Sequence, residues 1–241
     1  MNISQNTSVG ELVKLNFKTA SIFQDNNIDY CCGGNKTISE ACKSAGLEPE
    51  ELIGKLELIS EQNDVESQYI NGLSLEELSN YIVKRHHNYV RESIPPLRKN
   101  LEKICQVHGD HHPELFEISR IFTESSGDLI MHMQKEELML FPFIRRLELS
   151  STNGASLPKS PFGPVSNPIS NMLAEHQQEG DRFEQISKLS GNYNIPEDAC
   201  TTYEITLKQL QYFEDDLHRH IHLENNILFP KAIELEKNLA T

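Results

Sequence analysis

The sequence predicts an all-α protein in which a four-helix bundle follows a small domain of short helices. Long stretches rich in Leu, Glu, Lys and Gln run without interruption, and the 241 residues include only 12 glycines and no tryptophan. These residue types favour helix over sheet. Apolar residues recur at the spacing of one helix face, and loops separate four long segments of this kind, which is the pattern of a bundle.

Residues 1–60 are expected to form the small helical domain. The S/T-x-x-E pattern of a capping box begins at Ser8 and again at Thr37, and it marks the start of a helix. Pro49, followed by two glutamates, suits the first turn of a third helix. Residues 61–73 are polar and are expected to be a linker.

Residues 74–241 are expected to form the bundle. Its first helix opens at Ser74. Pro95 and Pro96 should kink or break this helix, because proline lacks an N–H and clashes with the preceding turn. The other three helices are predicted over residues 113–149, 168–189 and 197–235.

One motif occurs twice in the bundle. His132 and Glu136 precede Leu-Phe-Pro, and His220 and Glu224 precede the same three residues, so both segments read H-x-x-x-E-x-x-x-L-F-P. Residues four apart lie on one face of a helix, about 6 Å apart along its axis. Iron, manganese and zinc all accept imidazole together with carboxylate. The repeat therefore predicts a metal site inside the bundle.

The two remaining helices each supply a histidine at a matching offset. His176 lies 44 residues before His220, and His87 lies 45 residues before His132, with His86 as the alternative. The predicted metal ligands are His87, His132, Glu136, His176, His220 and Glu224. His222 should face away from His220, and like the other remaining histidines it is expected to be an ordinary surface or satisfied core residue, with a chance surface metal site with His218 as the alternative.

The overall charge and the cysteines exclude several classes of protein. A net charge of −14 argues against binding to nucleic acid or to an anionic membrane, because both require a basic surface. The N-terminus has no secretory signal and no apolar run spans a bilayer, so the chain is expected to be cytoplasmic.

Five cysteines at irregular spacing do not predict a disulfide framework. Cys42, Cys105 and Cys200 are expected to be packing residues.

These residues resemble the iron-sulfur cluster repair di-iron proteins, the repair-of-iron-centres family of YtfE and ScdA type. The stretch Asp29-Tyr30-Cys31-Cys32-Gly33-Gly34 resembles the signature of that family's N-terminal domain. The paired motifs and the single histidine in each partner helix resemble its hemerythrin-like bundle. The resemblance implies a non-haem centre of two iron ions, with Glu136 and Glu224 as bridging ligands.

The resemblance also implies a function. The chain would repair iron-sulfur clusters damaged by nitrosative or oxidative stress, by donating iron, by handling nitric oxide, or by both. Its partners would be damaged iron-sulfur proteins, nitric oxide or oxygen, and a second copy of the chain in a homodimer. Cys31 and Cys32 are hypothesised to act in redox or transfer steps. The alternatives are a nitric oxide reductase and a hemerythrin-type carrier or sensor, so whether the chain is an enzyme stays open.

Overall fold

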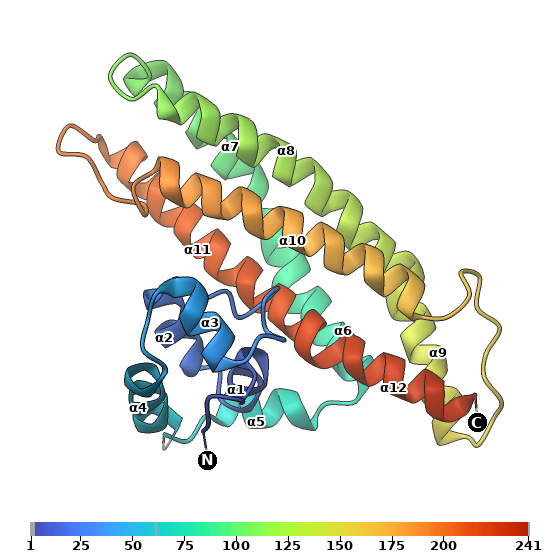
Figure 1. The fold of residues 1–241 in the computed structure, drawn as a ribbon. Helices are drawn as coiled ribbons and strands as arrows, with labels where there is room; N and C mark the ends of the chain where they lie inside the picture. The colour runs from blue at the N-terminus through green and yellow to red at the C-terminus, as the bar shows by residue number, and fades with distance from the viewer. Residues whose placement is uncertain (1–2, 61, 241) are drawn as a thin grey trace. The chain divides into compact units, whose positions relative to one another are not determined.

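The computed structural model describes residues 3–60 and 62–240, and within them the regular elements are helices (Figure 1). The predicted all-α fold is confirmed. None of the described helices is both long and apolar enough to cross a membrane. In chain order, the helices are α1 Val9–Leu15, α2 Thr19–Asp25, α3 Ile38–Ala45, α4 Pro49–Ser60, α5 Val65–Gly72, α6 Leu75–Ile82, η1 Val83–His87, α7 Asn88–His108, α8 Glu114–Lys135, η2 Glu136–Leu140, α9 Phe141–Thr152, α10 Ser166–Leu189, α11 Thr201–Leu223, η3 Glu224–Leu228 and α12 Phe229–Leu239.

The described residues fall into two compact units. One contains residues from 1–79, 144–165 and 219–241, and the other contains 80–143 and 166–218. The first unit holds the short N-terminal helices together with α12. The second holds most of the long helices.

The predicted helix starts in the first unit are confirmed. The Ser8 hydroxyl accepts a hydrogen bond from the N–H of Glu11, and Thr37 forms a complete capping box with Glu40. Helix α4 begins at Pro49. Residues 61–73 were expected to be a linker, but residues 65–72 within them form helix α5. The side chain of Asp64 caps this helix by accepting a hydrogen bond from the N–H of Glu66.

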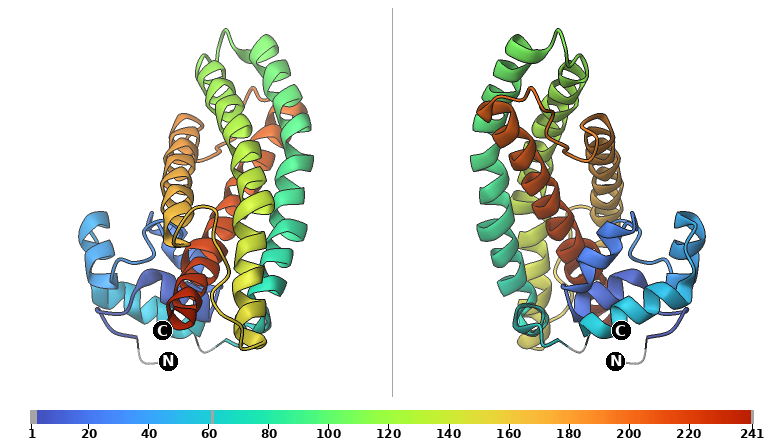
Figure 2. Two further views of the ribbon diagram at one scale, coloured as in Figure 1. Left: turned by 90° about the vertical axis from the view of Figure 1, so that its right-hand side faces the viewer. Right: turned by 90° about the vertical axis from the view of Figure 1, so that its left-hand side faces the viewer.

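In the second unit, α7, α8, α10 and the greater part of α11 run side by side (Figures 1 and 2). Helices α7 and α8 form a hairpin, and α10 packs against α8. The core of this unit contains a cluster of aromatic rings among aliphatic side chains. Phe183 stacks on Phe213 with ring centroids 5.4 Å apart, and Phe122 meets Phe213 edge-on at 5.4 Å. The bundle therefore has a close-packed interior beside its polar residues.

Pro95 and Pro96 were expected to kink or break the first long helix, and they do not break it, because α7 runs through both prolines to His108. Each proline removes one backbone hydrogen bond. Buried Ile94 and Leu97 flank the pair. Burial of such side chains contributes about 1.5–3 kcal/mol each, which offsets the lost bonds.

Glu214 on α11 is a half-buried carboxylate, and its partial removal from water raises its pKa from 4.5 to about 7. Because the native pKa is above the unfolded one, this group contributes stability below about pH 4.5. That contribution is lost as the pH rises through about 7. We expect Glu214→Gln to match the wild type near pH 4.5 and to be about 2 kcal/mol more stable above pH 7.

Chemical denaturation between pH 4.5 and 8 measures this difference. Glu92→Gln, an exposed glutamate on α7, serves as the control and should show no such trend. A Glu214→Gln variant that loses stability at pH 8 would contradict the assignment.

Candidate metal centre

Three short π-helical turns each contain a predicted ligand. His87 ends η1, Glu136 begins η2 and Glu224 begins η3. In the last two, the residue before Pro142 or Pro230 donates its N–H to the carbonyl of the glutamate, five residues back. Each proline lacks the N–H that would continue the α-helical pattern at the next residue. Single π-turns are frequent at functional sites, so the Leu-Phe-Pro part of the motif shapes the backbone at the glutamate.

In the second unit, three histidines converge on Glu136. The Oε2 atom of Glu136 lies 3.4 Å from Nε2 of His87 and 3.4 Å from Nε2 of His132. The Nε2 atoms of His132 and His176 are 3.0 Å apart. Donor atoms bound at about 2.1 Å lie about 3.0 Å apart around an octahedral ion and about 3.4 Å apart around a tetrahedral one. The observed distances match the edges of a coordination shell.

Glu136 is the clearest sign that the set suits a cation. Its side chain is fully buried, and neither carboxylate oxygen accepts a hydrogen bond within the described residues. A buried carboxylate without a donor or a positive partner costs several kcal/mol. A metal ion between Glu136 and the imidazoles would remove that cost.

The second copy of the motif lies in the first unit. Nε2 of His220 is 3.0 Å from Oε1 of Glu224, and both side chains are buried. This is the spacing expected from positions i and i+4. The pair therefore presents one imidazole and one carboxylate on a single helix face.

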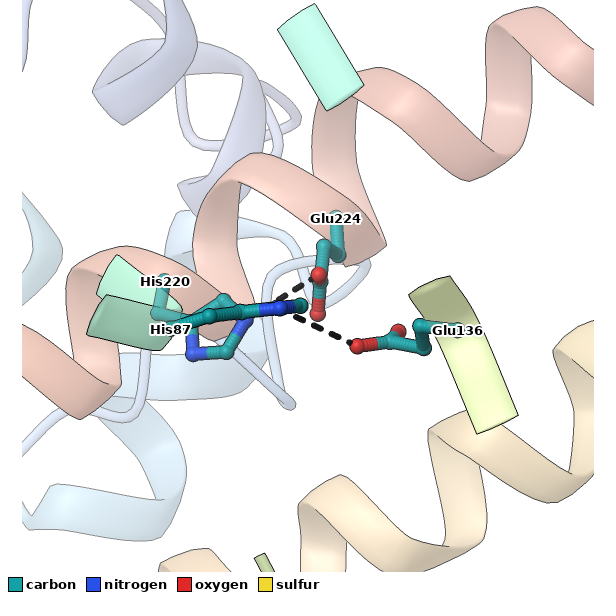
Figure 3. Close-up of side chains that lie close together, drawn as sticks. All are labelled: His87, Glu136, His220 and Glu224. Carbon is teal, nitrogen blue, oxygen red and sulfur yellow. Dashed lines mark hydrogen bonds and ion pairs between the residues drawn. The ribbon is translucent and has the colours of Figure 1, made fainter. Parts of the chain in front are cut away.

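The ligand atoms form two groups that could hold a metal ion, and within each group all of them lie within 4.8 Å of one another. Figure 3 shows the first group, with its four side chains pointing toward one another. Both groups include Glu136 and Glu224. The groups are His87, Glu136, His220 and Glu224, and His132, Glu136, His176 and Glu224.

Family comparison covers both parts of the chain. The family described as the hemerythrin HHE cation binding domain matches residues 78–232. The ScdA_N family, a domain of unknown function, matches residues 5–60. The iron-sulfur cluster repair protein ScdA of Staphylococcus haemolyticus (strain JCSC1435) is 30% identical over 231 residues, which is 95% of this chain and 99% of that protein. The chain belongs to the iron-sulfur cluster repair family.

Two further relatives show the same extent of similarity. The iron-sulfur cluster repair protein YtfE of Dickeya chrysanthemi (strain Ech1591) is 33% identical over 229 residues, covering 95% of this chain and 97% of the relative. The YtfE protein of Shigella boydii serotype 4 (strain Sb227) is 32% identical over 225 residues, covering 93% and 96%. The family resemblance thus extends over both the N-terminal helices and the bundle.

Two carboxylates that the sequence did not single out orient the histidines of this family site. Nδ1 of His132 is 2.8 Å from Oε2 of Glu175, and Nδ1 of His87 is 2.6 Å from Oε1 of Glu137. An ionised carboxylate can only accept, so each Nδ1 carries the hydrogen and each Nε2 keeps its lone pair for a metal. The hydrogen bond from His132 lowers the pKa of Glu175 to about 2. Burial opposes ionisation of Glu137, but bonds from His87 and Arg91 hold its pKa below the usual value.

The choice between His86 and His87 follows from the same geometry. His87 is in one of the two ligand groups, and His86 is in neither of those found among the described residues. Instead, Nδ1 of His86 lies 3.0 Å from Oδ1 of Asp216. His86 is therefore best explained as part of the bundle's interior hydrogen bonding.

Of the two interpretations of His222, the core residue is confirmed and the surface residue is not. Its side chain is 1% exposed, and its ring packs 6.0 Å from that of Phe17 and 5.9 Å from that of Tyr30. Burial lowers the pKa of His222 to about 3, so the ring is neutral. Helix periodicity placed His222 away from His220 correctly, but it could not show that the N-terminal helices cover this face.

The cysteines also differ from expectation. The turn that carries Cys31 and Cys32 is polar and rich in glycine, yet Cys31 is 3% exposed and Cys32 is half-buried. The adjacent Cys32 thiol, burial and Asp29 all raise the pKa of Cys31. Cys42 and Cys105 are buried packing residues as expected, whereas Cys200 is exposed, so that expectation is wrong.

Replacement of Glu175 tests the orienting role of these carboxylates. Glu175→Gln keeps an acceptor for His132 but removes the negative charge that makes the imidazole a better ligand. We expect affinity for a divalent metal to fall about 10–100-fold, measured by competition with a chelator. Glu184→Gln, an exposed position on the same helix, should leave affinity unchanged, and equal affinities for the two variants would rule out the role.

Proposed function

We propose that the chain repairs iron-sulfur clusters damaged by nitrosative or oxidative stress, and that it uses a non-haem di-iron centre to do so. The observation that carries the proposal is the buried carboxylate of Glu136, which has no hydrogen-bond donor among the described residues and has two imidazole nitrogens 3.4 Å from its Oε2. It lies in a domain of a cation-binding family. The curated relatives are named iron-sulfur cluster repair proteins.

The proposed ligands divide between two ions. Each of the two groups contains two histidines and two glutamates, and Glu136 and Glu224 are common to both. These two carboxylates would therefore bridge. The remaining ligands would be terminal: His87, His132, His176 and His220. When bound, the iron would provide a metal that can be donated and that can bind nitric oxide.

The protein's own contribution is to keep this site dry and the ligands correctly oriented. The six side chains are 0–3% exposed, so water competes poorly for the ions. Glu137 and Glu175 fix the tautomers of two imidazoles. With four protein donors in each group, an ion that prefers six ligands keeps open positions for a small molecule.

Those open positions favour a second candidate, reduction of nitric oxide at the same centre. Repair and reduction are compatible, because both need iron that small molecules can reach. A role as a hemerythrin-type carrier or sensor is less well supported, since such a role gives no reason for an N-terminal domain with adjacent cysteines. We propose that Cys31 and Cys32 pass iron or electrons during repair.

The metal content of the purified chain tests the centre itself. We expect elemental analysis to find about two iron ions per chain. The variant His132→Ala should lose most of this iron, because it lacks one of the six proposed ligands. Iron loading should also raise the melting temperature. His111→Ala, an exposed histidine, is the control. Equal metal content in the two variants would refute the assignment.

An activity assay tests the function. An enzyme whose [4Fe–4S] cluster has been damaged by nitric oxide should recover activity when the iron-loaded chain is added. It should not recover with His132→Ala. The double variant Cys31→Ser, Cys32→Ser should bind the two irons normally and repair slowly. Full repair by the double variant would remove the thiols from the proposal, and rapid nitric oxide turnover without repair would favour the reductase.

A further inference from the structure

The turn at residues 29–33 is held rigid by one carboxylate. Oδ1 of Asp29 accepts the N–H groups of Cys31 and Cys32, each at 2.9 Å, and Oδ2 accepts the N–H of Gly33 at 2.9 Å. A Cβ on Gly33 would lie 2.9 Å from the carbonyl oxygen of Asp29, so the turn requires glycine there. The backbone that carries both thiols is thus fixed from within the turn.

This turn brings both thiols to the same side. Adjacent side chains in an extended segment point to opposite faces, but Sγ of Cys31 lies 3.8 Å from Sγ of Cys32. The distance is far longer than a disulfide of about 2.05 Å. A tetrahedral ion bound to sulfur at about 2.3 Å holds two thiolates about 3.8 Å apart. The two sulfurs therefore have the separation of a chelating pair.

Asp29 supplies a third donor. Its Oδ1 lies 3.2 Å from Sγ of Cys31, and one ligand atom of each of the three residues lies within 4.8 Å of the others. Oδ2 accepts one hydrogen bond, and a carboxylate oxygen has room for two contacts. Asp29 is exposed while Cys31 is buried. An ion could thus enter from the Asp29 side and rest against the buried sulfur.

The turn is anchored to helix segment η3, directly after Glu224. The side-chain amides of Asn225 and Asn226 both donate to the carbonyl oxygen of Cys31 at 3.2 Å. The Asn226 side chain lies close to two glycines. A Cβ added to Gly10 would lie 2.5 Å from Asn226 Oδ1, and one added to Gly34 would lie 2.6 Å from it. A side chain at position 10 or 34 would thus collide with Asn226, and the two glycines leave the space that the Asn226 side chain occupies.

We propose that Asp29, Cys31 and Cys32 form a second metal site, which binds a single thiophilic divalent cation such as iron(II) or zinc. Binding replaces two thiol protons with two metal–sulfur bonds and involves no change of oxidation state. Three protein donors leave one position of a tetrahedral ion open, which permits ligand exchange. The site rests on the geometry of the turn alone, and it is separate from the histidine and glutamate groups.

Cobalt(II) provides a spectroscopic test. Added to the reduced, metal-free full-length chain, it should produce thiolate-to-cobalt charge-transfer absorption that saturates at one thiolate-bound ion per chain. The band should vanish in the double variant Cys31→Ser, Cys32→Ser and persist in Cys200→Ser, which removes an exposed thiol outside the turn. Asp29→Asn should weaken cobalt binding about tenfold or more.

One further variant separates this site from the proposed di-iron centre. His132→Ala should lose metal from the bundle and keep the charge-transfer band. The metal content therefore reports on the bundle site, and the band reports on the cysteine site. Absence of the band in the wild type, or its survival in the double serine variant, would overturn the inference. Loss of the band in His132→Ala would show that the thiols do not form an independent site.

Discussion

Burial of the Glu136 carboxylate, which has no hydrogen-bond donor among the described residues, is the constraint around which the bundle's polar interior is arranged. The neighbouring imidazoles turn Nε2 toward it, at 3.4 Å in His87 and in His132. Their Nδ1 atoms donate to Glu137 and Glu175, which are partly exposed and so remain hydrated. The hydrogens thus point outward and the lone pairs inward. Two imidazoles therefore present acceptor nitrogens to a buried carboxylate, and a cation between them would stabilise this arrangement.

The helix that carries His220 and Glu224 has a second function on its opposite face. His222 lies about 200° around the helix from His220, and it packs against Phe17 and Tyr30 of the N-terminal helices. Arg219 lies 4.2 Å over the ring of Phe17 and pairs with Glu66. Asn225 and Asn226, next after Glu224, hold the cysteine turn. A shift of Glu224 along its helix would therefore be transmitted directly to the backbone of Cys31.

The sequence predicts those parts of the structure that depend on periodicity. Helix spacing and the repeated motif identified the four helices and the residues that form the two groups, because residues four apart share a face whatever surrounds them. It did not reveal Glu137 and Glu175, which lie beside ligand residues but belong to no repeat. Burial of His222 depends on segments far away in the chain, and no local pattern reports such packing. The continuation of α7 through Pro95 and Pro96 likewise depends on burial of the side chains around the prolines, which the helix propensity of proline does not show.

The two kinds of donor set have different consequences for a bound ion. The histidine and glutamate groups consist of fully buried nitrogen and oxygen donors, and outlying carboxylates fix at least two of their imidazoles, which favours slow release. The cysteine turn provides two sulfurs and one oxygen with an exposed side, and it leaves a coordination position free for an incoming ligand. In the proposed repair function, iron would have to leave its donor when the cysteines of a client protein arrive. An ion that passes from the cysteines of the turn to the cysteines of a client keeps sulfur ligands throughout. An ion released directly from imidazole and carboxylate ligands to a client must exchange nitrogen and oxygen for sulfur. In the proposed function, the cysteine turn tied to the helix of Glu224 would therefore be a chemically suitable intermediate between the buried centre and a client's cysteines.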